Sequence, residues 1–191
     1  MSLRRMFDAS RPPSKPFPNT TGVAGYIGGN TPHVWTVDEW NDASNNGEHR
    51  MLPIWVGFHE DAPEEHAREA WKKAVDLGWA QYRHRYIALD MEDDTHDHKW
   101  CQIFAGILHK NGFKTLEYRS LSAILVDPTP ALIDNWVAHW NVNPNLSEAP
   151  RTEAFQYTND VPFDNTVVDL SVITATCYDN MGRGMRRTRA E

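Results

Sequence analysis

Short apolar segments alternate with amphipathic helical patterns along almost the whole chain, and this alternation constrains the fold more than any other feature. Residues 22–29 (GVAGYIGG) and 51–57 (MLPIWVG) are apolar runs of the length and composition of buried strands. Strands that alternate with helices usually pair in parallel as βαβ units. The sequence therefore predicts an α/β fold built on a largely parallel sheet.

Eight segments of the chain are candidate strands. They are residues 4–8, 22–29, 51–57, 85–92, 114–120, 134–140, 153–158 and 166–173. The helical patterns between them are concentrated in the first half of the chain. Eight strands with few helices favour a single small, trimmed TIM-like (β/α) barrel, and an open doubly wound sheet is the competing architecture.

Three helices have recognisable ends. Thr36 and Glu39 have the spacing of a capping box at the start of the first. We expect Asp61 and Glu64 to cap the second helix, and Gly78 to end it. Its apolar stripe is Ala67, Ala70, Trp71, Ala74 and Val75. The third helix carries Trp100, Phe104, Ile107 and Leu108 on one face and ends at Gly112.

A chain of 191 residues suits one domain with a sizeable core. We expect the barrel to occupy residues 1–173 and a basic C-terminal tail to occupy residues 174–191. The tail contains Arg183, Arg186, Arg187 and Arg189. Such a tail is usually disordered on its own, and contacts with other virion subunits or with further copies of the chain are its expected role.

The bulk composition excludes several classes of protein. A net charge of −7 argues against nucleic acid as the main ligand. No apolar run has membrane-spanning length, and the first ten residues lack the apolar core of a secretory signal. We therefore expect synthesis in the cytoplasm, followed by release on lysis or incorporation into a virion. Cys101 and Cys177 are expected to be free thiols, with a disulfide between them left open.

Four acidic residues could share one site. Asp90 and Glu92 lie two apart at the end of the fourth strand candidate, so their side chains should project together while Met91 faces the helices. Asp8 ends the first strand, and Asp169 lies in the last one, which neighbours the first in a closed barrel. Two carboxyl groups in an enclosed site have separated pKa values, as glycosidic cleavage requires.

Simpler interpretations compete with a catalytic role. An acidic pair at a strand end more often caps the next helix or faces water, and Arg11 could form a salt bridge with these acids. His96, Asp97 and His98 are expected to form a polar turn and not a metal site, because no third ligand stands at a suitable spacing. Neither a metal nor an organic cofactor is expected.

Several motifs, in order, resemble a known family. FDAS, ALDME, NWVAHW, AFQYT and VVDLS resemble glycoside hydrolase family 25, the lysozyme-type muramidases. GYIGGN and LPIWVG resemble a related actinobacterial glycoside-hydrolase-like domain more closely. The resemblance extends from about Phe7 to Ile173. It implies a β/α barrel that cleaves the β-1,4 bond after N-acetylmuramic acid in peptidoglycan.

The resemblance also implies roles for individual residues. Glu92 would be the general acid, and Asp90 would orient or stabilise the reacting centre. Asp8 and Asp169 would line the floor of the site. The candidate contacts to the glycan are Trp136, Trp140, Gln156, Tyr157, Tyr26 and Trp55.

The motifs are consistent with two functions that belong to different classes of protein. The first is a peptidoglycan hydrolase of phage or actinobacterial type. The second is a catalytically silent virion component that uses the barrel for glycan binding or assembly. The stretch from Trp55 to His59 departs from the aromatic pattern expected of active muramidases, and no wall-binding repeats follow the barrel.

Overall fold

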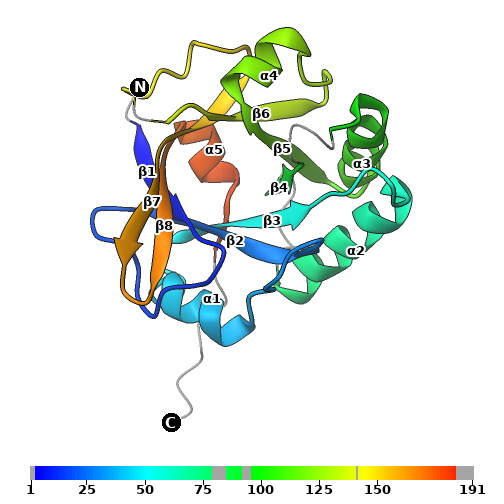
Figure 1. Cartoon of the computed structure of the whole chain (residues 1–191). Coiled ribbons are helices and arrows are strands. Elements are labelled where there is room, and N and C mark those ends of the chain that lie inside the picture. Colours follow the sequence, from blue (N-terminus) through cyan, green and yellow to red (C-terminus); the bar gives the residue numbers. More distant parts are fainter. Residues whose placement is uncertain (1–2, 79–84, 92–95, 141, 184–191) are drawn as a thin grey trace.

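Eight strands close into a barrel in the computed structural model, which describes residues 3–78, 85–91, 96–140 and 142–183 (Figure 1). The strands are β1 (Arg4–Asp8), β2 (Gly22–Gly29), β3 (Arg50–Val56), β4 (Arg85–Asp90), β5 (Phe113–Ser120), β6 (Ile133–Ala138), β7 (Thr152–Phe163) and β8 (Thr166–Ile173). Each strand pairs with its neighbours in sequence, and β8 pairs with β1. The ring is complete, so the barrel is confirmed and the open sheet is excluded.

One strand runs against the other seven. β8 is antiparallel to both β7 and β1, whereas all other pairs from β1 to β7 are parallel. Phe163 of β7 pairs with Thr166 of β8, so only two residues connect these strands. A parallel connection needs a crossover of about a dozen residues or more, and the chain must therefore turn back as a hairpin. The sheet is therefore largely parallel, as predicted, with β8 as the antiparallel strand.

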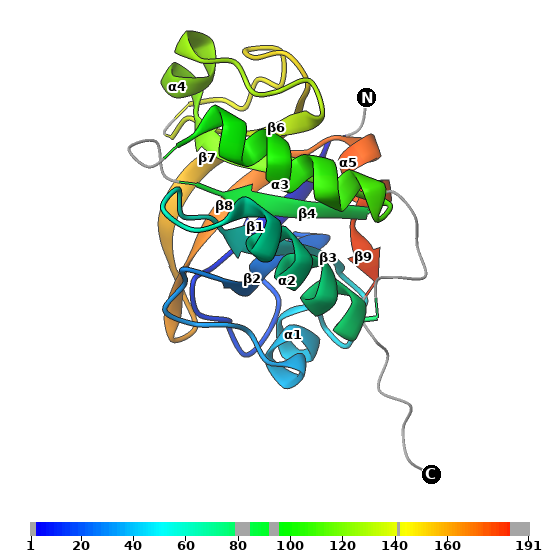
Figure 2. The ribbon, with the colours of Figure 1, turned by 90° about the vertical axis from the view of Figure 1, so that its right-hand side faces the viewer.

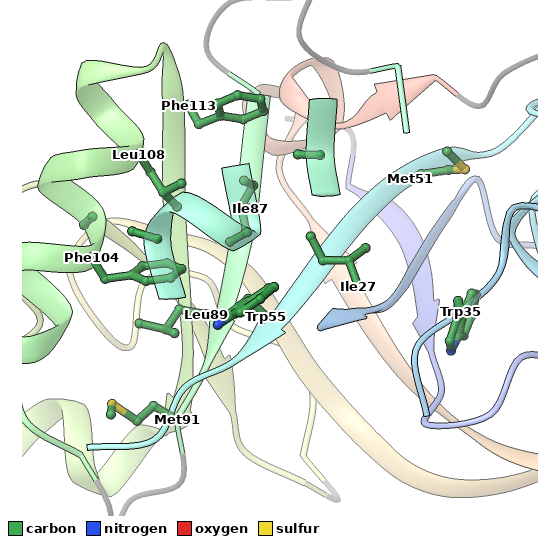
Figure 3. Packing of buried hydrophobic residues seen from close by; sticks show 14 of the residues in the cluster. Ile27, Trp35, Met51, Trp55, Ile87, Leu89, Met91, Phe104, Leu108 and Phe113 are labelled. Atoms are coloured by element: carbon green, nitrogen blue, oxygen red, sulfur yellow. The ribbon is translucent and has the colours of Figure 1, made fainter. Parts of the chain in front are cut away.

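The helices lie on the outside and are unevenly distributed. They are α1 (Val37–Ala43), α2 (Pro63–Asp76), α3 (His98–Lys110), α4 (Leu121–Val126) and α5 (Ala175–Asn180). Figure 2 shows the two longest, α2 and α3, side by side across the outer face of the barrel. Between β4 and α3, Figure 3 shows Ile87 and Leu89 facing Phe104 and Leu108. All four side chains are fully buried, so this layer is a continuous apolar core outside the barrel.

The helix ends test the sequence predictions. The Thr36–Glu39 capping box is present, with the Glu39 carboxylate accepting from the Thr36 N–H at 2.7 Å. Gly78 and Gly112 follow α2 and α3 at φ of 82° and 84°, a backbone conformation that favours glycine. The predicted cap of α2 was wrong: its N-cap is Ala62, without a side-chain hydrogen bond.

Two further details of the helical layer differ from expectation. The Asp61 carboxylate lies 3.2 Å from Nε2 of His66 instead of capping α2. Trp71 is 37% exposed, while the smaller residues Ala67, Ala70 and Ala74 form the buried stripe against the barrel. Close approach of α2 to the sheet explains this choice, since only small side chains fit there. Cys101 and Cys177 are both free and buried, which removes the disulfide between them.

The segment after β8 closes the bottom of the barrel. α5 is followed by β9 (Gly182–Arg183), which pairs antiparallel with the start of β3. The Arg85 guanidinium donates to the carbonyl oxygens of Asp179 and Met181, both at 2.5 Å. Residues 175–183, which the sequence analysis assigned to the tail, therefore pack on the barrel; residues 184–191 lie outside the described residues.

No helix in the described part of the chain is both long and apolar enough to cross a membrane.

We predict that Met181→Ala destabilises the protein by about 2–5 kcal/mol. The wild-type side chain is fully buried and belongs to the cluster of apolar side chains inside the barrel, which includes Met6 and Leu52, so its loss leaves a cavity. Leu125→Ala is the matched control: this α4 side chain is 59% exposed, and its loss should change stability by less than about 0.5 kcal/mol. Urea denaturation followed by tryptophan fluorescence measures both. Equal effects of the two substitutions would show that α5 and β9 do not seal the barrel.

Candidate active site

A polar cavity opens at the carboxyl ends of the parallel strands. Its volume is about 190 Å³, and each of the eight barrel strands contributes one residue to its wall. These residues are Asp8, Tyr26, Ile54, Asp90, Tyr118, Trp136, Gln156 and Asp169, in order from β1 to β8. The cavity is thus the top layer of the barrel interior, the position where β/α barrels build active sites.

Strand register brings the acids together. Side chains alternate between the interior and the helical layer, so Met6 and Asp8 of β1 both point inward while Phe7 points outward. Asp8 pairs directly with Asp169 across the β1–β8 ladder. Because β8 is antiparallel, Asp169 reaches this level from the middle of its strand and not from its end. The expectation that Asp8 and Asp169 are neighbours is confirmed.

Asp90 ends β4 and points into the same cavity. The Tyr26 hydroxyl donates to Oδ2 of Asp90 at 3.2 Å. Met91, the next residue, is fully buried and turns toward α3, where its sulfur lies 3.4 Å from Sγ of Cys101. The alternation expected for Asp90 and Met91 is therefore present. Glu92, the predicted general acid, lies outside the described residues.

Gln156 organises the opposite wall. Its carbonyl oxygen accepts hydrogen bonds from the Tyr118 hydroxyl at 2.7 Å and from the Trp140 indole N–H at 2.6 Å. Its amide nitrogen donates to Oδ2 of Asp169 at 3.0 Å. The other oxygen of Asp169 accepts from the backbone N–H of Asp160 at 2.7 Å. One amide side chain thus fixes two aromatic rings and one carboxylate relative to each other.

The pKa values of two of the acids, Asp8 and Asp169, are raised. Burial raises the pKa of Asp8 well above its usual value, and the negative charges of Asp169 and Asp90 raise it further against a hydrogen bond from Gln156. Burial also raises the pKa of Asp169, although hydrogen bonds from Asp160 and Gln156 oppose this. No lining residue is cationic. The surroundings therefore favour the protonated forms of Asp8 and Asp169 more than water does.

The predicted glycan contacts fall into two groups. Tyr26, Trp136 and Gln156 line the cavity, and Trp140 stands at its edge, 48% exposed and hydrogen-bonded to Gln156. Tyr157 instead packs against a separate apolar cluster that includes Ile124 and Phe155.

Trp55 faces the helical layer, where its indole N–H donates to Nδ1 of His66 at 3.0 Å. A Cβ on Gly28 would lie 2.4 Å from this ring, so the glycine makes room for it. Trp55 is only 2% exposed and does not line the cavity.

Sequence reasoning missed two of the cavity residues, Ile54 and Tyr118, of which Tyr118 is the polar one. Tyr118 pairs in register with Asp90 of β4 and with Trp136 of β6, and its ring contacts that of Trp136 edge-on at 5.2 Å. Strand alternation in KTLEYRS, aligned with the end of the preceding strand, would have indicated it.

A second, larger cavity of about 380 Å³ lies beyond the end of β1. It is lined by Ser10, Arg11, Pro12, Pro32, His33, Glu39, Asn165 and Thr166. Arg11 therefore lines a different cavity from the acids. The one acid here, Glu39, is held by the capping box and by His33 at 2.9 Å. This cavity lacks the grouped carboxyl groups of the first.

Comparisons with known proteins identify the fold. No family model matches the chain, and no curated protein matches it. Several solved structures are similar, and three of them show the range of the likeness. The catalytic domain of an endolysin from Listeria monocytogenes bacteriophage P40 is 13% identical, with a TM-score of 0.71, over 93% of this chain and 96% of that chain. A bacterial lysozyme from Streptomyces coelicolor is 15% identical, with a TM-score of 0.67, over 93% of this chain and 96% of that chain.

A family 25 glycosyl hydrolase from Bacillus anthracis is 16% identical, with a TM-score of 0.63, over 86% of this chain and 83% of that chain. The chain thus has the barrel fold of family 25 glycosyl hydrolases, as its sequence motifs suggested.

We predict that Asp8→Asn stabilises the protein at neutral pH. The raised pKa means that folding favours the protonated carboxyl, so wild-type stability should fall as the pH rises above the ordinary aspartate value of about 3.9. Asparagine does not titrate, so the variant's melting temperature should exceed that of the wild type at about pH 7 and approach it at about pH 4.

The matched control for this measurement is Asp164→Asn. Hydrogen bonds from Ser14 lower the pKa of this exposed carboxyl, so its loss should not raise the melting temperature. Scanning calorimetry across the pH range measures both variants. A higher melting temperature for Asp164→Asn than for Asp8→Asn would contradict the account of the site.

Proposed function

We propose that this protein is a glycoside hydrolase of the muramidase type that cleaves the glycan strands of peptidoglycan. The observation that carries the proposal is the convergence of Asp8, Asp90 and Asp169 in one cavity at the mouth of the barrel. Glycosidic cleavage needs carboxyl groups in different protonation states around a cationic transition state. The family 25 barrel fold and the ALDME and VVDLS motifs add support.

Asp90 would stabilise the reacting sugar. The Tyr26 hydroxyl fixes one of its oxygens at the cavity wall, which holds the carboxylate in place before the substrate arrives. A preorganised negative charge lowers the energy of the developing oxocarbenium ion more than it stabilises the neutral ground state. The Asp90 carboxylate would also accept a hydrogen bond from the N–H of a 2-acetamido group on the same sugar.

Glu92 would act as the general acid. It follows Asp90 by two positions in the ALDME motif, and this role rests on the family resemblance. It would give its proton to the glycosidic oxygen as the bond from that oxygen to the anomeric carbon breaks. A water molecule would then supply the new hydroxyl and return a proton to the enzyme.

Aromatic side chains beside the acids fit a sugar substrate. The Trp136 ring is buried in the wall and donates its N–H to Ser171 at 3.0 Å, whereas Trp140 remains half-exposed at the edge. The hydrogen bond from Trp140 to Gln156 sets the orientation of this ring relative to Asp169. An exposed, oriented ring offers a flat apolar face to a pyranose.

The predicted test is turbidity loss and release of reducing ends from purified peptidoglycan. The wild type should clear the suspension. Glu92→Gln should lower the rate about 10²–10⁴-fold, because it removes the transferable proton. Asp90→Asn should lower it about 10²–10³-fold while keeping the acceptor for Tyr26. Glu69→Gln, an exposed acid on α2, is the control and should retain full activity.

Circular dichroism and melting temperature would show that each variant is folded. Equal rates for the wild type and both site variants would remove Glu92 and Asp90 from the mechanism. No clearing of any wall type by the wild type would reject hydrolysis. Co-sedimentation of the wild type with peptidoglycan would then point to the silent, glycan-binding module.

A further inference from the structure

A second cluster of reactive side chains lies outside the barrel, between β5 and α3. It consists of His96, just before α3, Cys101 in its first turns, and Glu117 in the middle of β5. Cys101 and Glu117 are fully buried, and the His96 side chain is 5% exposed. Glu117 belongs to the strand face opposite Tyr118, so the cluster is separate from the candidate active site.

The three ligand atoms are spaced as metal ligands are. Nε2 of His96 lies 3.0 Å from Oε1 of Glu117, and Sγ of Cys101 lies 3.4 Å from the same oxygen. All three atoms lie within 4.8 Å of one another. Zinc bonds of about 2.0–2.3 Å in a tetrahedron separate neighbouring ligand atoms by roughly 3.3–3.8 Å. Small side-chain adjustments would therefore suffice to surround one ion.

One oxygen of the Glu117 carboxylate is available to bind a metal ion in this cluster. Its Oε2 is buried and has no hydrogen-bond partner among the described residues. A buried carboxylate oxygen without a partner is costly, and a cation would satisfy it. With His96, Cys101 and one oxygen of Glu117 bound, three of the four positions usual around zinc would be filled, and a water molecule would take the fourth.

The surroundings of His96 support a metal ligand. Its second ring nitrogen, Nδ1, lies 3.4 Å from Oδ2 of Asp127. Arg119 holds Asp127 by donating to its carbonyl oxygen at 2.9 Å. A carboxylate on one ring nitrogen fixes the proton there and leaves the other nitrogen free to bind metal, a common arrangement around zinc-binding histidines.

The ligand set selects among metals. Imidazole, thiolate and carboxylate together suit zinc, whereas magnesium and calcium prefer oxygen ligands alone. The charges of such a site also balance. The positive charges of zinc and of Arg119 together offset the negative charges of the Cys101 thiolate and of the Glu117 and Asp127 carboxylates. The burial of all three ligands would shield the ion from a substrate, which indicates a structural role.

We propose that His96, Cys101 and Glu117 bind one zinc ion, with Asp127 orienting the histidine. On binding, the Cys101 thiol loses its proton to solvent and the thiolate, the imidazole and the carboxylate each form a bond to the ion. The zinc ties the start of α3 to β5, behind the strands that carry Asp90 and Tyr118. The proposal is independent of the hydrolase function.

Zinc binding is tested on the intact protein after removal of metals with a chelator. In titration against a chromophoric zinc indicator, the wild type should take up one zinc per chain. Cys101→Ser and Glu117→Gln should lose this tight uptake, and Asp127→Asn should weaken it about 10- to 100-fold. Cys177→Ser, which removes the other buried thiol, and His109→Ala, which removes an exposed imidazole at the far end of α3, are the matched controls and should bind as the wild type does.

Cobalt(II) gives a readout that does not depend on the variants folding. The cobalt-loaded wild type should show a thiolate-to-cobalt charge-transfer absorption and the visible bands of tetrahedral cobalt, and Cys177→Ser should retain both. A wild type that takes up neither zinc nor cobalt would overturn the proposal and leave His96 in contact with Glu117 and Asp127 alone. Uptake that is lost with Cys177→Ser and kept with Cys101→Ser would overturn it too.

Discussion

The antiparallel pairing of β8 with β1 is the interaction on which the rest of this structure depends. It completes the hydrogen-bonded ring, and it sets Asp169 directly opposite Asp8 at the mouth of the barrel. With Asp90 in the same cavity, closure gathers three carboxyl groups in a lining without a cationic side chain, and Asp8 is buried among them. The raised pKa of Asp8 is the electrostatic consequence of this closure, and it opposes folding at neutral pH.

Hydrophobic pattern predicted most of the strands because strands such as β2, β3 and β4 are buried on both faces and are therefore continuous apolar runs in the sequence. The range of β8 matched its prediction, whereas β4 ended earlier than expected, at Asp90. The direction of β8 could not be predicted from its own residues, since it follows from a connection of two residues whose length depends on where β7 ends. The cap of α2 failed because Asp61 has a competing partner in His66.

The sequence predicted those site residues that lie at or near the ends of strands. It did not predict those whose position depends on how the strands pair. Asp8, Asp90 and Asp169 met as expected, while Tyr118 was identified only once its pairing with Asp90 was known. Trp55 was assigned to the glycan site, but its ring packs over Gly28 on the outer face. The His96–Cys101–Glu117 cluster joins residues from a loop, a helix and a strand, so no local spacing indicated it.

Closure of the barrel forces Asp8 and Asp169 to share one cavity whose lining has no cationic side chain. The most direct measurement is a carboxyl carbon-13 NMR titration of Asp8, assigned with Asp8→Asn and repeated in Asp169→Asn. The account predicts that Asp8 titrates well above the ordinary aspartate pKa of about 3.9 and that its pKa falls when Asp169 loses its charge. An ordinary pKa for Asp8 that is unchanged in Asp169→Asn would contradict the account.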